Sequence, residues 1–233
     1  MSDISQNTTA VLARVASSAV AAGKEPSEIT VIAASKMNEA LRVREAFAAG
    51  IEVFGENRVQ EMLEKNRQGA YSGASLHFIG RLQRNKVRQV VGVAELIHSA
   101  DSLPLIAEID RCAGKASLVQ DILIEINIAG EESKGGFSSA ETASVLDAVS
   151  SFKNVRVRGL MAIPPICSNP ADNVPFFESM TQLFVDNSLK KYDNISMDFL
   201  SMGMSGDFEA AIACGANMVR IGSAIFGPRN YNI

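Results

Sequence analysis

A chain of 233 residues with 47% hydrophobic and 21% charged residues has the composition of a globular protein with a substantial core. Its net charge of −4 argues against a general nucleic-acid surface. No apolar run reaches the roughly 18 residues that a membrane span requires. The three cysteines, Cys112, Cys167 and Cys214, lack metal or disulfide spacing, and the first 23 residues lack the pattern of a secretory signal. We therefore expect free thiols and a cytoplasmic protein.

Hydrophobic periodicity predicts a helix over residues 4–22, closed by Gly23, and after it eight alternations of strand and helix with short connections. The expected strands cover 29–36, 51–54, 76–79, 95–98, 121–127, 155–162, 197–201 and 217–222. The expected helices cover 39–49, a segment ending near 67, segments starting near 84 and 102, 139–151, 172–190 and a short stretch after 205. We expect Asn38 to cap the helix over 39–49.

Strict alternation of strands and helices predicts a parallel sheet, and eight units in this length predict a closed (β/α)8 barrel. An open doubly wound sheet is the alternative, but it usually has a glycine-rich first turn, and residues 35–38 contain no glycine. We expect residues 1–233 to form one barrel domain with an extra N-terminal helix. The C-terminal ends of all strands then meet at one mouth, where barrel enzymes carry their sites.

Lys36 ends the first apolar strand, where burial would lower its pKa and make its amine a nucleophile for aldehydes. The alternative is that Lys36 turns to solvent or pairs with a loop carboxylate such as Glu56. Arg220, in the last strand, faces the same choice between a site residue and an outward residue paired to a helix. The rest of the mouth decides between these alternatives.

Glycine- and hydroxyl-rich segments follow the last two strands. They contain Ser201, Gly203 and Ser205, and Gly222 with Ser223. Loops after strands 7 and 8 of such barrels commonly bind phosphate, and we expect a serine here to open the next helix. A phosphate opposite a strand-end lysine indicates pyridoxal 5′-phosphate (PLP), whose aldehyde forms a Schiff base with lysine.

Ordered motifs extend this pattern from about residue 29 to 231. They are Ser35-Lys36; 54–57 with 59–61; 77–80 with Leu82-Gln83 and Asn85-Lys86; 132–134 with Gly136; 158–164; 201–205; and 220–222 with Phe226-Gly227. Together they resemble the YggS/PROSC family of pyridoxal phosphate homeostasis proteins. The chain departs from that family at Leu76, where a tryptophan is usual, and at Asn38, where a basic residue is common.

The resemblance implies the barrel of the alanine racemase N-terminal domain, with Lys36 as the Schiff-base lysine. It places Asn57 near the cofactor ring and Arg220 at the pyridine nitrogen. The residues that it places around the phosphate are Ser201, Gly203, Ser205, Gly222 and Ser223.

An arginine has only hydrogen-bond donors, so a pyridine nitrogen facing it stays unprotonated, which makes the ring a poor electron sink. Related racemases also take a tyrosine from a second domain, whereas this sequence ends at Ile233, shortly after Tyr231. We therefore expect a carrier or buffer of PLP without robust catalysis. The alternatives are a PLP-dependent amino-acid racemase and, more remotely, a Schiff-base aldolase that uses Lys36 without a cofactor.

The basic run over residues 81–88 is typical of a solvated helix face, because no aromatic residues are interleaved with it. It could also assist the approach of a phosphorylated ligand. Lys134 is expected to be a surface charge or a second amine for the cofactor. We expect a monomer whose partners are PLP and, transiently, PLP-dependent apo-enzymes, without nucleic acid or membrane.

Overall fold

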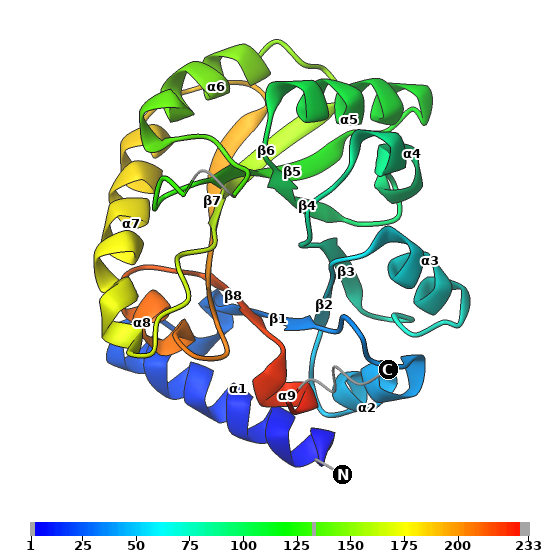
Figure 1. The fold of residues 1–233 in the computed structure, drawn as a ribbon, viewed down its shortest axis with the longest axis vertical. Helices are drawn as coiled ribbons and strands as arrows, with labels where there is room; N and C mark the ends of the chain where they lie inside the picture. Colours follow the sequence, from blue (N-terminus) through cyan, green and yellow to red (C-terminus); the bar gives the residue numbers. More distant parts are fainter. Residues whose placement is uncertain (1–2, 132–133, 229–233) are drawn as a thin grey trace.

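The computed structural model, which describes residues 3–131 and 134–228, is a closed barrel of parallel strands with helices around its outside (Figure 1). Strands β1 to β8 follow one another around the barrel in sequence order. The fold predicted from the alternation of elements is therefore confirmed. Three residues of the sequence argument, Glu132, Ser133 and Tyr231, lie outside the described residues.

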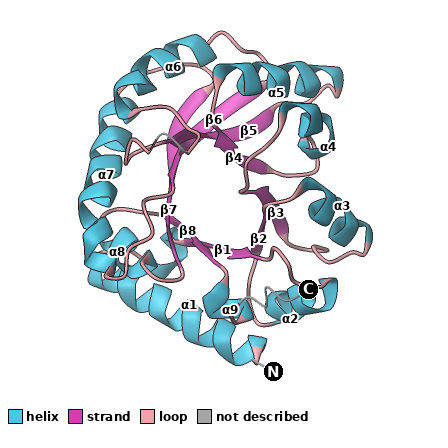
Figure 2. Cartoon of the chain, viewed as in Figure 1, coloured by secondary structure: helices cyan, strands magenta, loops and turns pink. Residues whose placement is uncertain are grey.

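The elements alternate along the described chain (Figure 2). The strands are β1 Thr30–Ala34, β2 Val53–Glu56, β3 Ser75–Phe78, β4 Leu96–Ala100, β5 Gln120–Ile126, β6 Val155–Ala162, β7 Ile195–Met204 and β8 Met218–Ile221. The α-helices are α1 Ile4–Ala21, α2 Ala40–Ala48, α3 Val59–Arg67, α4 Val87–Val90, α5 Leu103–Lys115, α6 Thr142–Val149, α7 Val174–Ser188, α8 Phe208–Ala213 and α9 Ser223–Phe226. Short 3-10 turns are η1 Pro26–Glu28, η2 Arg84–Lys86, η3 Ser139–Glu141 and η4 Pro170–Asn173.

The pairing of β1 with both β2 and β8 closes the barrel and excludes the open sheet. Ile32 of β1 lies opposite Val53 on one side and Arg220 on the other. The first and last strands are therefore neighbours, and the loops that follow them meet at the same mouth.

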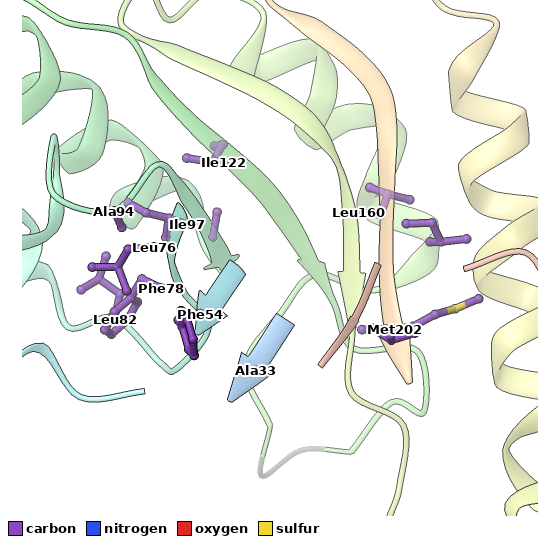
Figure 3. Close-up of a cluster of buried hydrophobic side chains, with 14 of the residues drawn as sticks. Ala33, Phe54, Leu76, Phe78, Leu82, Ala94, Ile97, Ile122, Leu160 and Met202 are labelled. Atoms are coloured by element: carbon purple, nitrogen blue, oxygen red, sulfur yellow. The ribbon is translucent and has the colours of Figure 1, made fainter. Parts of the chain in front are cut away.

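Apolar side chains fill both faces of the strands, which explains why the strand sequences lack alternation. Inside the barrel, Ile32 packs with Leu96, Leu123, Met161 and Met218. A larger layer lies between the strands and the helices, and Figure 3 shows part of it. The members labelled there are Ala33, Phe54, Leu76, Phe78, Leu82, Ala94, Ile97, Ile122, Leu160 and Met202.

The N-terminal helix α1 lies against α2, α8 and α9 on the outside of the barrel. Val11 and Val15 are buried there, whereas Val20 is 64% exposed. Where a helix was expected from about residue 84, the chain forms η2 followed by the four residues of α4. Among the described residues, no helix combines the length and apolar character needed to cross a bilayer.

Strand β7 extends further than the sequence pattern indicated. The predicted strand ended at residue 201, whereas β7 continues to Met204, and its register with β8 shifts between Ser201 and Met204. Ser201, the last residue of the predicted strand, and Gly203, which was expected in the loop, therefore both belong to β7. This difference decides where the two residues lie relative to the mouth.

Candidate functional site

A cavity of about 300 Å³ lies at the C-terminal ends of β1, β2, β7 and β8. It brings together six of the eight predicted site residues, which are Lys36, Asn57, Ser205, Arg220, Gly222 and Ser223. They come from separate loops and strand ends, so the barrel closure itself assembles them. Ser201 and Gly203 are absent from the described lining of this cavity.

The loop that carries Lys36 is held on both sides of the lysine. Lys65 Nζ donates a 2.7 Å hydrogen bond to the carbonyl oxygen of Ser35, and the Met37 N–H donates to Glu61 Oε1 at 2.5 Å. Met37 has φ of 60°, which is rare for a residue other than glycine. These bonds hold the backbone in that conformation and direct Lys36 toward the cavity that it lines.

The bonds around Lys36 continue into a buried ionic cluster beneath the loop. Glu56 is fully buried at the end of β2, and its Oε1 accepts hydrogen bonds from Lys65 Nζ at 2.7 Å and from Ser35 Oγ at 2.6 Å. Tyr71 donates a third bond to the same oxygen, at 2.8 Å. Burial and the neighbouring Glu56 carboxylate raise the pKa of Tyr71, so its phenol stays protonated and can donate. Glu56, the carboxylate considered as a partner for Lys36, is thus bound to Lys65.

The prediction that Asn38 caps the helix after β1 is wrong. Asn38 instead closes the turn that contains Lys36. Its Nδ2 donates to the Lys36 carbonyl oxygen at 3.1 Å, and its Oδ1 accepts from Arg42 Nε at 3.1 Å. The N-cap position of α2 is Glu39, and its side chain makes no capping bond. The short polar side chain of Asn38 therefore stabilises the loop that carries Lys36.

The loops after β7 and β8 are joined by one hydroxyl. Ser205 Oγ accepts hydrogen bonds from the backbone N–H groups of Gly222 at 3.1 Å and Ala224 at 3.3 Å. Ser205 was expected to open the helix after its own strand, but α8 begins at Phe208 with Asp207 in the N-cap position. The serine instead links the two loops predicted to bind phosphate.

Arg220 is a buried cation that faces the cavity from β8, and it is 5% exposed. Its Nη1 donates to Ser201 Oγ at 2.6 Å, and its Nη2 donates to the Ala162 carbonyl oxygen at 2.9 Å. Burial lowers the pKa of Arg220 to about 10, against the opposing influence of the charges on Glu125 and Asp207. Within residues 3–131 and 134–228, no carboxylate lies within ion-pair distance of this guanidinium.

Two histidines extend the contacts of Arg220 across the barrel interior. His98 Nδ1 lies 3.1 Å from Ser201 Oγ, and His98 Nε2 lies 3.1 Å from His77 Nδ1. Burial lowers the pKa of His77 to about 4, and burial with the neighbouring His77 and Arg220 lowers the pKa of His98 well below its ordinary value. Both rings are neutral near pH 7, so each offers one donor and one acceptor, as this chain of contacts requires.

Ser201 and Gly203 support the cavity from positions inside β7. Ser201 is fully buried and holds Arg220 in place. Gly203 has φ of 87°, and a Cβ atom added to it would lie 2.6 Å from the Cβ atom of Ala211 in α8. Contact of either residue with a ligand stays a prediction.

A smaller cavity of about 140 Å³ shares Asn57, Ile79 and Ile163 with the first. Ser99 and Glu125 also line it. Asn57 Oδ1 and Ser99 Oγ are buried and have no hydrogen-bond partner in the described part of the chain. Burial raises the pKa of Glu125 to about 7, with the Asp101 charge adding to the shift and Arg220 and Arg81 opposing it. The smaller cavity thus contains polar atoms to which a ligand can donate or from which it can accept hydrogen bonds.

The sequence argument missed Lys65, His98 and Glu125. Only Lys65 had a visible signal: it follows Val59 and Met62 at helical spacing, and all three lie on the buried face of α3. His98 and Glu125 lie within apolar strands, and no pattern in the sequence shows which face of the strand they occupy.

Comparison with known proteins agrees with this geometry. The family described as "Alanine racemase, N-terminal domain" matches residues 10–230, so the fold and site define a barrel of that class. Over 221 residues, 95% of this chain and 96% of the relative, the chain is 42% identical to the pyridoxal phosphate homeostasis protein of Aquifex aeolicus. It is 40% identical over 233 residues to the one from Pseudomonas aeruginosa, covering 99% of this chain and 98% of the relative. The chain belongs to the family of pyridoxal phosphate homeostasis proteins.

Among solved structures, PipY of Synechococcus elongatus with PLP bound superposes with a TM-score of 0.79 and 32% identity. The match covers 91% of this chain and 100% of PipY. An alanine racemase from Clostridium difficile matches with a TM-score of 0.70 but only 13% identity, and the match covers 58% of that chain. The second likeness shows the fold alone.

Proposed function

We propose that this protein binds PLP as a Schiff base on Lys36 and acts as a carrier or buffer in intracellular PLP homeostasis. The observation that carries the proposal is the cavity in which Lys36 faces Arg220 and the linked loops after β7 and β8. Relatives at 40–42% identity are named pyridoxal phosphate homeostasis proteins, and PipY binds PLP in its solved structure.

The residues present fit this cofactor. Lys36 supplies the amine, Arg220 supplies donors for a ring nitrogen, and the buried Oδ1 of Asn57 has no hydrogen-bond partner in the described chain. The phosphate would lie against Ser205, Gly222 and Ser223, near Gly206, where an added Cβ atom would meet nothing within 4 Å. When bound, PLP supplies an aldehyde carbon that condenses with a lysine amine.

The proposed absence of robust catalysis rests on the residues around the cavity. The described lining of the cavity contains two ionisable side chains, Lys36 and Arg220, and Arg220 stays charged near neutral pH. Tyr71 is bound to Glu56 and Tyr192 to Asp147, and neither lines the cavity. Racemisation needs an acid or base on each face of the substrate. We propose that the protein is a cytoplasmic monomer that passes PLP to apo-enzymes transiently.

The proposal predicts a yellow protein whose colour depends on Lys36. The purified protein is titrated with PLP, reduced with borohydride and mapped by mass spectrometry, with Lys36→Ala as the test variant. Label on Lys36 in the wild type, and loss of the Schiff-base absorbance in the variant, are expected. Lys134→Ala is the control, because Lys134 bonds to Glu131 at the rim and does not line the cavity. A colourless wild type with added PLP would contradict the proposal and favour an aldolase-like use of Lys36.

A measurement of amino-acid racemisation distinguishes the carrier from the alternative, a PLP-dependent racemase. Alanine and serine of one configuration are incubated with the PLP-loaded protein, and the enantiomers are resolved by chiral chromatography. We expect no robust interconversion. Turnover that is abolished by Lys36→Ala would establish the racemase instead.

A further inference from the structure

A second and larger cavity, of about 550 Å³, lies beside the first between α3, η2 and α5. Asn57 borders both cavities. The lining of the second contains four cationic side chains, Arg58, Arg81, Arg84 and Lys86, and one carboxylate, Asp101, which leaves a net charge of +3. A positive cavity in a chain of net charge −4 is a local feature that the overall composition does not explain.

Three of the four cationic side chains in this cavity have no ion-pair partner among the described residues, unlike other cationic side chains on the surface. Arg156 and Arg158 both bind the Asp121 carboxylate at 2.7–2.8 Å. In the second cavity, Arg81 approaches Asp101 only to 3.8 Å. Arg58, Arg84 and Lys86 have no carboxylate within ion-pair distance in the described part of the chain.

The nearby carboxylate of Glu108 does not neutralise Arg84. The two charges interact, but Glu108 is bound to Arg111 by hydrogen bonds of 2.8 and 2.6 Å. The like charges around the cavity therefore repel one another in the absence of a ligand, and an anion would relieve that repulsion.

Backbone groups add donors to the same space. Val59 and Gln60 form the first turn of α3 and line the cavity, and the N-cap residue Arg58 makes no side-chain capping bond. Their N–H groups have no acceptor among the described residues, so they are available to an anion. Buried Phe78 and Leu105 form an apolar floor. Donors, cations and an apolar floor suit a phosphate group attached to an organic body.

We propose that this second cavity binds a phosphorylated small molecule, separately from the Lys36 cavity. The proposal goes beyond the proposed function, because it uses none of Lys36, Ser205, Arg220, Gly222 or Ser223. The proposal assigns different roles to the basic residues of the run 81–88. Arg81, Arg84 and Lys86 line the cavity, whereas Arg88 does not.

Pyrophosphate is the probe, titrated into the PLP-loaded protein so that the Lys36 cavity is occupied. Calorimetry measures affinity at two salt concentrations, and amide NMR shifts locate the binding. We expect one pyrophosphate per chain, weaker binding at higher salt, and shifts at Val59 and Gln60. Arg84→Gln/Lys86→Gln should weaken binding at least tenfold, and Arg58→Gln should weaken it too, because each substitution removes a charge-assisted donor. Arg88→Gln should change the affinity less than twofold.

The proposal is overturned by the absence of binding at low salt, or by shifts confined to Gly206 and Gly222 of the first cavity. It is equally overturned if Arg88→Gln weakens binding as much as the double variant, since that result indicates diffuse attraction to a basic surface. Repeating the titration with unloaded Lys36→Ala protein separates this test from the proposed function. Shifts at Val59 and Gln60 in that variant support the second site even where PLP binding fails.

Discussion

Among the described residues, two cationic side chains are buried, Lys65 of α3 and Arg220 of β8. Their hydrogen-bond partners differ. Each residue is 5% exposed. Lys65 binds two carboxylates, Glu56 and Glu61, and the Ser35 carbonyl oxygen, all at 2.7 Å. Arg220 binds one hydroxyl and one carbonyl oxygen, with no carboxylate within ion-pair distance in the described chain.

This difference separates a structural cation from one that, by our proposal, binds the ligand. A buried charge without a countercharge costs stability, so it persists where function requires it. Lys65 pairs with two carboxylates and donates a third hydrogen bond to the backbone of the Lys36 loop. Arg220 lacks a countercharge and lines the cavity, where an electron-rich ring nitrogen can accept from its remaining donors.

Replacing Lys65 with methionine tests the structural half of this comparison and should have the largest effect. Lys65→Met leaves fully buried Glu56 without its cation, and we expect a loss of roughly 3–5 kcal/mol in the free energy of unfolding. Urea denaturation followed by circular dichroism measures the loss.

The matched control is Glu61→Gln, which removes the partly exposed carboxylate of the same cluster. It should cost about 1 kcal/mol, because an amide still offers an oxygen to Lys65 and to the Met37 N–H. If Lys65→Met costs no more than the control, the cluster does not hold the Lys36 loop in the way that its bonds indicate.

The same substitution at Arg220 should behave differently. Arg220→Met breaks no ion pair of the described residues and removes a poorly compensated charge, while it leaves Ser201 Oγ and the Ala162 carbonyl oxygen without this donor. We expect these effects to offset one another, with a net loss below about 2 kcal/mol. PLP affinity, followed by absorbance, should nevertheless fall at least tenfold, because the variant lacks the donors that we propose for the ring nitrogen. A loss of stability equal to that of Lys65→Met, with PLP binding intact, would invert the comparison.

The sequence indicated Lys36 because it directly follows an apolar strand, and barrel topology then places such a residue at the mouth. Arg220 was assigned to the site only through the family resemblance. The sequence could not identify the Lys65 cluster in full. The bond from Lys65 to Ser35 joins residues 30 positions apart, and only the closed fold brings them together. The helical spacing of Val59, Met62 and Lys65 showed a lysine on the buried face, but not what it binds.

Ser201 shows a different limit. The sequence placed it at the end of a strand, in a segment expected to bind phosphate, but β7 continues to Met204 and its register with β8 shifts between Ser201 and Met204. Register shifts depend on the neighbouring strand, so the sequence of β7 alone does not reveal them. For the same reason the contact of Ser201 with His98, 103 positions away, had no signal in the sequence.

The pH dependence of stability at Glu125 sharpens the comparison further. Burial raises the pKa of Glu125 from its ordinary value of 4.5 to about 7, although the nearby charge of Arg220 opposes this shift. Between these two pH values the folded chain holds a proton that the unfolded chain has released, so this group's contribution to stability falls as pH rises and then levels off above 7. The rise from 4.5 to about 7 is about 2.5 pKa units, and each unit corresponds to about 1.4 kcal/mol, so ionised Glu125 should cost on the order of 3 kcal/mol at pH 8.

Glu125→Gln removes this ionisation while keeping the shape of the side chain. The free-energy difference between variant and wild type should therefore be near zero at pH 4.5 and grow in the variant's favour up to pH 8, measured by urea denaturation across the range. Glu52→Gln, at an exposed position, is the control and should show no such trend. A flat difference for Glu125→Gln would mean that the charge of Arg220 already neutralises Glu125, and that this cation is not kept for a ligand.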